Sequence, residues 1–301
     1  MMTGVYHIPV LAEESIDALQ IQSGYEVMDA TFGGGGHSRL ILDQLGNGRL
    51  FAFDQDEDAA GNALEDDRLF FIRHNFRYAK NFLRHFGVEQ LDAIFADLGV
   101  SSHDFDVAER GFSFRFEGTL DMRMNRNAKV DATAVVNEYA EEKLQEIFRL
   151  YGEIKNARRL ANEIVKARNA QRIATTTQLK EIVALCAPRA TENKYLAQVF
   201  QALRIEVNEE MEALKEFLEA SLGLLRPGGR LAIITYHSLE DRLCKNFMKT
   251  GNFKGEVIKD FYGNIQTPFE VITRKVITPS ETELAENPRS RSAKLRVAEK
   301  I

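Results

Sequence analysis

Short apolar runs alternate with helical stretches over the first part of the chain. The apolar runs occupy Tyr25–Ala30, Arg49–Asp54, Leu69–Arg73 and Leu91–Asp97, and stretches with helical spacing of their apolar residues lie between them. Short strands separated by helices are typical of βαβ units, in which the strands lie parallel in one sheet. The pattern therefore predicts an α/β fold.

The same pattern returns near the end of the chain. A turn at Gly223–Gly229 precedes the apolar run Arg230–Tyr236, which predicts another strand. Two further candidate strands, Gly255–Phe261 and Phe269–Thr278, flank a turn at Gly263-Asn264. This arrangement predicts a closing antiparallel hairpin.

Between these two parts the spacing of apolar residues is only helical. From residue 130 to residue 200 the apolar side chains recur at i, i+3, i+4 and i+7, as in Leu144, Ile147, Phe148 and Tyr151. We therefore expect a discontinuous α/β domain, residues 1–107 and 203–301, interrupted by an inserted all-helical domain, residues 108–202.

Composition narrows the class of protein. The chain has 301 residues, of which 44% are hydrophobic and 28% charged, and this excludes disordered, collagen-like and coiled-coil rod proteins. No apolar run approaches the roughly 18 residues of a membrane span, and no secretory signal is visible, so no membrane association is expected. The two cysteines, Cys186 and Cys244, form no CxxC motif, so we expect a reducing cytoplasmic location. The six histidines do not pair at ligand spacing, so no metal is expected.

Charge is unevenly distributed along the chain. The net charge of −6 excludes a generally polycationic protein, but residues 149–172 hold seven basic and two acidic residues. That tract is either a solvated helix face or a nucleic-acid contact. Residues 287–301 hold five basic residues and one acidic residue, and serines alternate with the first arginines, which favours phosphate binding. The alternative is that these arginines pair with the acidic stretch Glu206–Glu219 and tie down the terminus.

A run of four glycines, Gly33–Gly36, follows the first predicted strand and precedes a helix. Glycines let the backbone approach a ligand closely, and the helix N-terminus offers unpaired N–H groups. Asp54, at the end of the next strand, suits the hydroxyl groups of a ribose. Asp29 precedes the glycines and would repel a pyrophosphate, whereas a ligand with an ammonium and a sulfonium is favoured. The pattern therefore predicts a nucleoside cofactor such as S-adenosylmethionine.

Two further groups end strands of the predicted sheet. Asp97 ends the fourth strand, and ligands of open α/β sheets bind outside the carboxyl ends of the strands. We expect Asp97 to face the reacting end of the cofactor. His237 ends the strand Arg230–Tyr236, beside a polar group in which Ser238 and Asp241 could also cap a helix.

Six motifs of the chain resemble the RsmH (MraW) family, the bacterial N4-cytosine methyltransferases of small-subunit ribosomal RNA. In the order of that family they are Asp29–Ser38, Asp97–Ser102, Arg110–Phe114, Asp121–Met124, His237–Arg242 and Glu286–Ser292. The resemblance implies a class I S-adenosylmethionine-dependent methyltransferase fold, which is Rossmann-like, with an inserted all-helical domain. It also implies that the substrate is a cytosine N4 in the decoding region of small-subunit (16S) ribosomal RNA.

The resemblance also implies which residues act. The cofactor contacts would be Gly35, Gly36, His37, Asp54, Phe76, Asp97 and Asp104. Asp104 stands where the family usually has glutamine, and a carboxylate cannot donate a hydrogen bond. A second departure is Gly152-Glu153-Ile154, because family members usually have two glutamates after the glycine.

For catalysis we predict Asp97, or a backbone carbonyl just after it, together with His237. RNA contacts are predicted at Arg110, Arg123, Arg289, Arg291, Lys294 and Arg296. Three other functions stay open at this stage: a methyltransferase of DNA amines, a non-catalytic RNA-binding assembly factor and, more distantly, a nicotinamide oxidoreductase. The sequence does not determine an oligomeric state.

Overall fold

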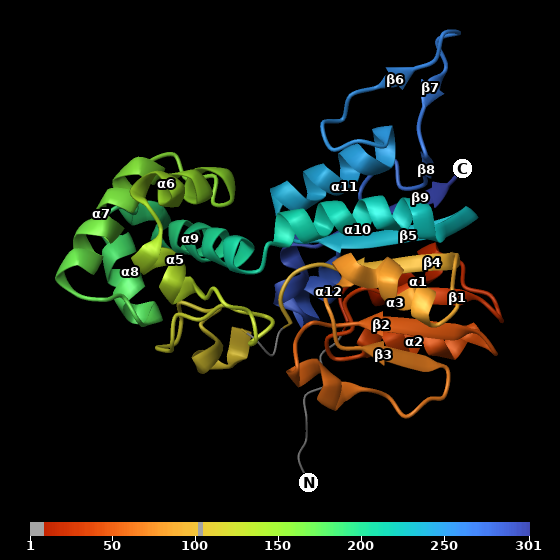
Figure 1. Cartoon of the computed structure of the whole chain (residues 1–301), viewed down its shortest axis with the longest axis horizontal. Helices are drawn as coiled ribbons and strands as arrows, with labels where there is room; N and C mark the ends of the chain where they lie inside the picture. The colour runs from red at the N-terminus through yellow and green to blue at the C-terminus, as the bar shows by residue number, and fades with distance from the viewer. Residues whose placement is uncertain (1–8, 102–104) are drawn as a thin grey trace. The chain divides into compact units, whose positions relative to one another are not determined.

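The computed structural model describes residues 9–101 and 105–301, and the chain divides into two compact units (Figure 1). The α/β unit runs to Gly99 and resumes over Glu212–Ile301, and the helical unit is Val100–Met211. The predicted helical domain, residues 108–202, falls inside the observed helical unit, which is longer at both ends. Asp104 lies outside the described residues.

A seven-stranded sheet forms the centre of the α/β unit. Its order is β3-β2-β1-β4-β5-β9-β8, and β9 runs antiparallel to both of its neighbours while β1 to β5 are parallel. The strands are β1 (Glu26–Asp29), β2 (Arg49–Phe53), β3 (Leu69–Ile72), β4 (Leu91–Asp97), β5 (Leu225–Thr235), β8 (Phe269–Val271) and β9 (Lys294–Lys300). The first four predicted strands are confirmed to within one residue at each end.

The strand order reverses between β1 and β4. From β1 the chain moves outward through β2 to β3, and it then returns to place β4 on the other side of β1. In open α/β sheets this switch point is where ligands bind, outside the carboxyl ends of the strands. The predicted α/β, Rossmann-like fold is therefore confirmed, and its topology selects the ends of β1, β2 and β4 as the place to look for a site.

Helices cover both faces of the sheet. Strand residues such as Val27 and Phe95 pack with α1 (Ala12–Leu19) and α2 (Gly36–Leu45). The alternate residues, such as Met28, pack on the other face with three further helices. Those helices are α3 (Ala79–His85), α10 (Glu210–Leu224) and α11 (Ser238–Thr250). Because both faces are covered, the parallel strands are almost continuously apolar rather than alternating.

The fifth strand begins earlier than predicted. Leu91 pairs with Leu225, whereas Ala93 already pairs with Arg230, so the intervening residues of β5 bulge out of the ladder. The predicted start of this strand, after a turn at Gly223–Gly229, is therefore wrong. Gly223 lies in α10, whereas Gly228 and Gly229 belong to the bulge, in which Gly228 has a φ of +79°.

The predicted closing hairpin is wrong in its strand pairing. Phe269–Val271 (β8) pairs with the C-terminal strand β9, and not with the 255–261 segment. That segment contributes β6 (Ile258–Lys259), which pairs with β7 (Ile265–Gln266) across the predicted turn. The sequence analysis did not predict strand β9, because its basic residues alternate with apolar ones and were interpreted as a basic tract. In the structure the alternate residues Leu295 and Val297 are buried in the core.

The helical unit has its own apolar core. The predicted periodic residues Leu144, Ile147 and Phe148 are buried there, which confirms the helical spacing. Its α-helices include α5 (Ala132–Glu138), α6 (Glu141–Leu150), α7 (Ala157–Ala170), α8 (Thr176–Ala184) and α9 (Glu192–Val207). A short α12 (Glu281–Glu286) lies in the α/β unit. Among the described residues, no helix combines the length and apolarity needed to cross a membrane.

Candidate active site

Three aspartates mark the carboxyl edge of the central strands. Asp29 and Asp97 are the last residues of β1 and β4, which are neighbours, and Asp54 directly follows β2. Because parallel strands end at one edge, these side chains gather at the switch point. Each was singled out in the sequence, but their surroundings assign them different roles.

Asp29 holds the glycine-rich turn in shape. Its carboxylate is fully buried and accepts hydrogen bonds from the backbone N–H of Thr31, at 3.0 Å, and from Ser38 Oγ, at 2.6 Å. Burial raises the pKa of Asp29 to about 6, although both hydrogen bonds act in the opposite direction. With both oxygens engaged and no exposure, Asp29 acts on a ligand through the turn and does not contact it directly.

The glycine-rich turn is open on its outer side. Gly33 and Gly35 have φ values of +53° and +74°, a region that side chains rarely adopt. A Cβ at Gly35 would lie 2.9 Å from the ring of Phe32, so this position requires glycine for packing as well. A Cβ at Gly33 or Gly34 would meet no atom within 4 Å. The turn therefore presents bare backbone to any ligand that lies against it.

Asp54 joins this turn to the end of β2. One carboxylate oxygen accepts from the backbone N–H of Gly33 and the other from that of Asp56, both at 2.8 Å. Burial raises the pKa of Asp54 to about 6. A carboxylate offers about four acceptor sites, so two such bonds leave capacity for the hydroxyl hydrogens of a ribose.

Phe76 follows β3 in a turn that is tied back to β2. Asn75 accepts from the backbone N–H of Arg77 at 2.9 Å, and its amide donates to Gln55 Oε1 at 2.9 Å. The ring of Phe76 is part-buried and lies edge-on to Phe217, with centroids 5.1 Å apart. This link between the second and third strand ends was not predicted, because a Gln–Asn contact has no local sequence signal.

Asp97 accepts a hydrogen bond from a tyrosine that the sequence analysis did not single out. Its side chain is 22% exposed, and its Oδ1 accepts from the Tyr236 hydroxyl at 2.8 Å. Burial, with smaller contributions from Asp29 and Glu240, raises the pKa of Asp97 to about 7, although the hydrogen bond from Tyr236 opposes this. Burial and the nearby Asp97 also raise the pKa of Tyr236, so the tyrosine remains a donor.

His37 lies on the other side of Asp97. Its Nδ1 is 4.0 Å from Asp97 Oδ2, and its Nε2 is 2.9 Å from the carbonyl oxygen of Val10. Since a carbonyl only accepts, Nε2 carries a proton in this contact. The ring is 6% exposed and lies 4.5 Å from that of Phe95. The predicted contact residue is thus close to Asp97 but largely enclosed by its own unit.

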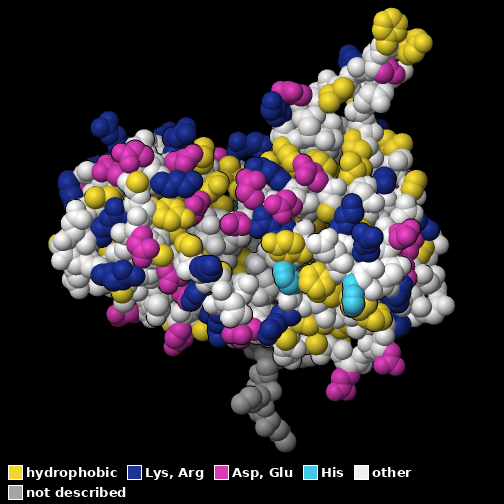
Figure 2. Space-filling model, in the orientation of Figure 1, with side chains coloured by type: hydrophobic (Ala, Val, Ile, Leu, Met, Phe, Trp, Pro, Cys, Tyr) yellow, Lys and Arg dark blue, Asp and Glu magenta, His cyan; other side chains and the backbone are white. Residues whose placement is uncertain are grey.

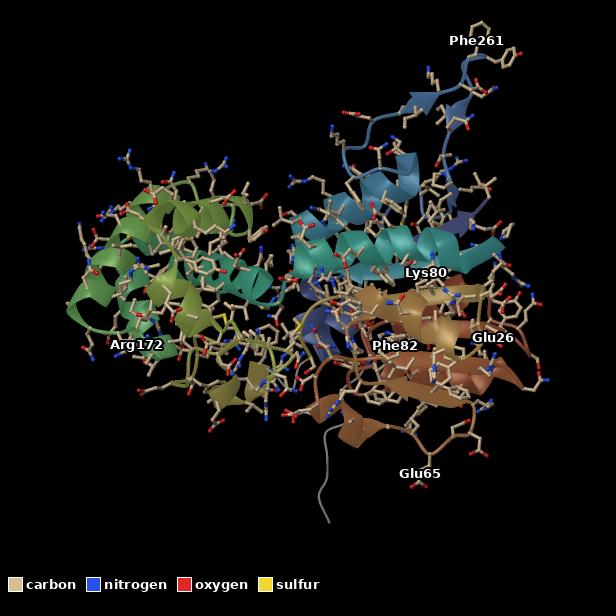
Figure 3. The ribbon with its side chains drawn as sticks, viewed as in Figure 1. Glu26, Glu65, Lys80, Phe82, Arg172 and Phe261 are labelled. Atoms are coloured by element: carbon tan, nitrogen blue, oxygen red, sulfur yellow. The ribbon has the colours of Figure 1, made fainter. Side chains whose placement is uncertain are left out.

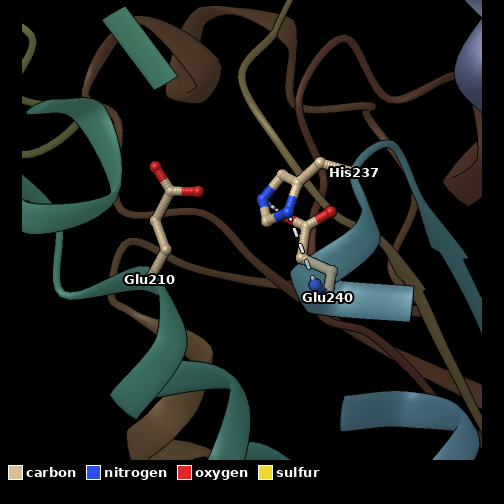
Figure 4. Close-up of side chains that lie close together, drawn as sticks. All are labelled: Glu210, His237 and Glu240. Atoms are coloured by element: carbon tan, nitrogen blue, oxygen red, sulfur yellow. Dashed lines mark hydrogen bonds and ion pairs between the residues drawn. The ribbon is translucent and has the colours of Figure 1, made fainter. Parts of the chain in front are cut away.

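His237 caps a helix, and Glu240 engages its ring (Figure 4). It is the N-cap of α11, where its Nδ1 accepts from the backbone N–H of Glu240 at 3.4 Å, and its Nε2 is 2.9 Å from Glu240 Oε1. The second Glu240 oxygen accepts from the backbone N–H of Tyr236 at 3.1 Å. The cap expected at Ser238 therefore lies one residue earlier, and the Nδ1 atom of His237 makes the capping hydrogen bond while its Nε2 lies close to the Glu240 carboxylate.

The predicted RNA-contacting residues of the helical unit serve its internal structure. Arg110 is 4% exposed, and its guanidinium donates to the carbonyl oxygens of Arg123 and Met124 at 3.0 and 3.3 Å. Arg123 binds Asp121 through two nitrogens, each at 2.8 Å. The burial of Arg110 is at odds with a phosphate contact, because a buried guanidinium cannot reach an external phosphate.

The predicted contacts near the C-terminus separate into two pairs. Arg289 and Arg291 lie in an exposed 3₁₀ turn, Pro288–Ser292. In β9, Arg296 Nε donates to Asp241 Oδ1 at 2.7 Å, and Lys294 Nζ lies 3.5 Å from Asp241 Oδ2. The first pair is exposed to solvent, and the second is engaged within the unit by Asp241, an acidic partner that lies outside the predicted acidic stretch 206–219.

Comparisons with known proteins agree over the full length of the chain. The family model described as "MraW methylase family" matches residues 4–301. A Bacteroides fragilis protein named "Ribosomal RNA small subunit methyltransferase H" is 60% identical over 296 residues, covering 98% of this chain and 97% of that protein. A Flavobacterium johnsoniae protein of the same name is 56% identical over 297 residues, covering 98% of each.

Proposed function

The chain belongs to the MraW methylase family, and on this premise we propose that it transfers a methyl group from S-adenosylmethionine to the exocyclic N4 of a cytosine in small-subunit (16S) ribosomal RNA. The observation that carries the proposal is the full-length identity of 60% to a relative named as a small-subunit ribosomal RNA methyltransferase. We place the target cytosine in the decoding region, as the sequence motifs imply.

The edge of the sheet fits the proposed cofactor. S-adenosylmethionine supplies a methyl group on a positively charged sulfonium. The open backbone of Gly33 and Gly34 allows close approach, and Asp54 retains acceptor sites suited to ribose hydroxyls. Gly35 has the positive φ of the turn, Gly36 and His37 begin α2, and Phe76 and Asp97 lie at the neighbouring strand ends.

Asp97 is the proposed catalytic residue. The N4 nitrogen of cytosine is a weak nucleophile because its lone pair is delocalised into the ring. With a pKa near 7, the Asp97 carboxylate is poised to accept an N4–H hydrogen bond and then hold the proton that the nitrogen loses. Tyr236 occupies Oδ1, which orients the carboxylate and leaves Oδ2 on the side toward His37.

For His237 we propose a positioning role in the same reaction. Both of its ring nitrogens contact Glu240, whose other oxygen binds the backbone N–H of Tyr236. This arrangement fixes the backbone of the residue that donates to Asp97. His237 thereby acts on the carboxylate through Glu240 and Tyr236.

The decisive experiment maps the transferred methyl group. Small subunits are isolated from a strain that lacks this protein and are incubated with the purified protein and methyl-labelled S-adenosylmethionine. The RNA is digested to nucleosides and analysed by mass spectrometry. We expect label in N4-methylcytidine at one decoding-region position, and label in another nucleoside or in the ring carbon of cytosine would contradict the proposal.

Two controls separate the alternative functions. Duplex DNA is assayed in parallel, and efficient labelling of DNA amines would favour a DNA methyltransferase. Release of S-adenosylhomocysteine is measured on the same preparations. A non-catalytic assembly factor would bind the cofactor and the RNA but would release no S-adenosylhomocysteine.

A further inference from the structure

A two-stranded hairpin projects from the α/β unit and carries two aromatic rings at its tip. Strands β6 and β7 form a sheet of their own, separate from the central sheet. The hairpin extends beyond α11 and β8 in Figure 1, and Phe261 lies at its far end in Figure 3. Phe261 is 97% exposed and Tyr262 is 86% exposed. Figure 2 shows hydrophobic side chains gathered at this tip.

The turn that carries these rings is well ordered by hydrogen bonds. Asp260 Oδ1 accepts from the backbone N–H groups of Tyr262 and Asn264, both at 2.9 Å, and Oδ2 accepts from Asn264 Nδ2 at 3.0 Å. These bonds hold the pKa of Asp260 below its usual range. The rings of Phe261 and Tyr262 meet edge to face, with centroids 5.6 Å apart. The rings are therefore presented to solvent by a preformed turn.

The base of the hairpin is anchored to α11. Phe253 stacks on Phe247 of that helix, with centroids 5.1 Å apart, and its carbonyl accepts from Asn246 Nδ2 at 2.9 Å. One residue earlier, Asn252 Nδ2 donates to the carbonyl of Glu256 at 2.7 Å. Exposing two large aromatic rings to water is unfavourable, and folding of the unit does not require it. An exposed aromatic pair on an anchored arm therefore indicates a binding role.

The faces of the hairpin do not resemble a protein-docking surface. Ile258 pairs with Gln266 and Lys259 pairs with Ile265, so each face combines one aliphatic with one polar or cationic side chain. Lysine is depleted from the cores of protein interfaces. The strands thus expose isolated aliphatic side chains next to polar ones, whereas the tip presents two adjacent aromatic rings.

The segment of the chain that contains the hairpin is basic. Residues 245–275 contain six lysines or arginines and three acidic residues, in a chain whose net charge is −6. All six basic residues are exposed: Lys245, Lys249, Lys254, Lys259, Arg274 and Lys275. Of the acidic residues, Asp260 is engaged in the turn. This charge complements a polyanion, and exposed aromatic rings with nearby cations are the usual platform for unpaired bases.

We propose that the β6–β7 hairpin is an RNA-binding arm, on which Phe261 and Tyr262 stack against unpaired bases while the surrounding basic residues hold phosphates. The inference rests on the proposed function for the nature of the substrate, and it adds a second contact region on the same RNA. Stacking on rings tolerates any base, so the arm contributes affinity rather than the choice of the target cytosine.

The test compares two double variants at the tip of the hairpin with one double variant in its strands. F261A/Y262A removes the rings, F261L/Y262L keeps apolar bulk without rings, and I258S/I265S changes side chains of the strands that are 57% and 56% exposed. Binding of a fluorescein-labelled single-stranded oligoribonucleotide is measured by anisotropy. Methyl transfer is measured on small subunits over a range of concentrations, and the oligomeric state by sedimentation.

Loss of one stacked base weakens binding by about 5- to 150-fold. We therefore expect both the alanine and the leucine pair to bind the oligoribonucleotide at least about tenfold more weakly and to raise KM for small subunits at unchanged kcat. The serine pair should bind like the wild type. Because Phe261 and Tyr262 are almost fully exposed, the melting temperature should not change in either tip variant.

Two results would overturn the inference. One is wild-type RNA affinity and KM in the alanine pair, in a protein that methylates small subunits normally. The other combines two observations: the leucine pair binds RNA with wild-type affinity, and the wild type is a dimer that the alanine pair converts to monomers. That result would assign the tip to contact with a second copy of the chain. Failure of the proposed function itself is distinguishable, because the wild type would then bind RNA through the tip without forming N4-methylcytidine.

Discussion

Two sets of polar side chains, one in each unit of this protein, have different roles. In the helical unit they are mainly donors to backbone carbonyls: Thr133 binds the carbonyl of Leu120 at 2.7 Å, and Arg110 binds that of Arg123 at 3.0 Å. In the α/β unit the contrasting set consists of carboxylates at the ends of strands, although buried hydroxyls there, such as those of Ser221 and Thr250, also donate to backbone carbonyls. Asp54 and Asp97 accept hydrogen bonds, and burial raises the pKa of both.

This difference separates structural from chemical use of a buried polar group. A donor that satisfies a buried carbonyl lowers the energy of the fold. A carboxylate with a raised pKa is held in an environment that disfavours its charge, which costs stability, and it retains lone pairs for a ligand. Perturbed carboxylates therefore identify a functional site better than burial by itself does.

The largest effect is expected from removing the charge of Asp97. Asp97→Asn can still accept from Tyr236 but cannot take up the N4 proton, so single-turnover methyl transfer at saturating substrate should fall by about 10²- to 10⁴-fold. RNA affinity should change little. The wild-type rate should rise with pH through about 7, and the variant should lack this dependence. An unchanged rate would move catalysis to a backbone carbonyl after Asp97.

The second largest effect is expected from replacing Asp54, which should weaken cofactor binding. Asp54→Ala removes the acceptors proposed for the ribose and the bond to the Gly33 N–H. Loss of hydrogen bonds to a charged acceptor costs about 1.5–3 kcal/mol, or about 10- to 150-fold in affinity for S-adenosylmethionine. Calorimetry on the folded variant measures this value. Wild-type affinity would remove Asp54 from the ribose role.

Acid titration sharpens the contrast between the units. The pKa of Asp97 is raised from 3.8 to about 7 in the folded protein, so between these values the folded state binds a proton that the unfolded state does not. Stability should therefore rise as the pH falls from about 8 to about 5.5, by about 2 kcal/mol for this group. Urea unfolding at both pH values measures the gain, and Asp97→Asn should lose this part of it. An equal gain in the variant would contradict the assigned pKa.

A matched change in the helical unit should affect stability only. Thr133→Val preserves the shape of the side chain but leaves the buried carbonyl of Leu120 without this donor. We expect a loss of about 1–2 kcal/mol in the free energy of unfolding. Cofactor affinity, measured by calorimetry, should stay at the wild-type value. A weaker cofactor complex with unchanged stability would remove the distinction between the units.

The smallest effect is expected at the exposed arginines before β9. Each lost phosphate contact lowers the salt dependence by a little under one unit, so Arg289→Ala with Arg291→Ala should flatten log K against log salt by about 1.5–2 units. Arg296→Ala serves as the control, because it breaks the ion pair with Asp241 and should lower the melting temperature instead. A double variant that melts earlier but retains the wild-type salt slope would assign these arginines to structure.

Local patterns of the sequence were sufficient for the framework of the site. Alternating apolar runs and helical spacing identified strands β1 to β4 and the inserted helices, because buried strands and amphipathic helices leave their periodicity in consecutive residues. The same holds for the glycine turn after β1 and for Asp54, which lies at a characteristic distance from it. The ends of β1, β2 and β4 were thus predictable as the ligand-binding edge.

Contacts between distant segments required the folded chain. Tyr236 is 139 residues from Asp97, and no spacing rule links them, yet their hydrogen bond orients the proposed catalytic carboxylate. The role of His237 as a cap, the pairing of β8 with β9 and the engagement of Arg296 by Asp241 depend in the same way on which strands become neighbours. Side-chain type and periodicity are local properties, whereas burial, pKa and hydrogen-bond partners arise only when the sheet brings remote residues together.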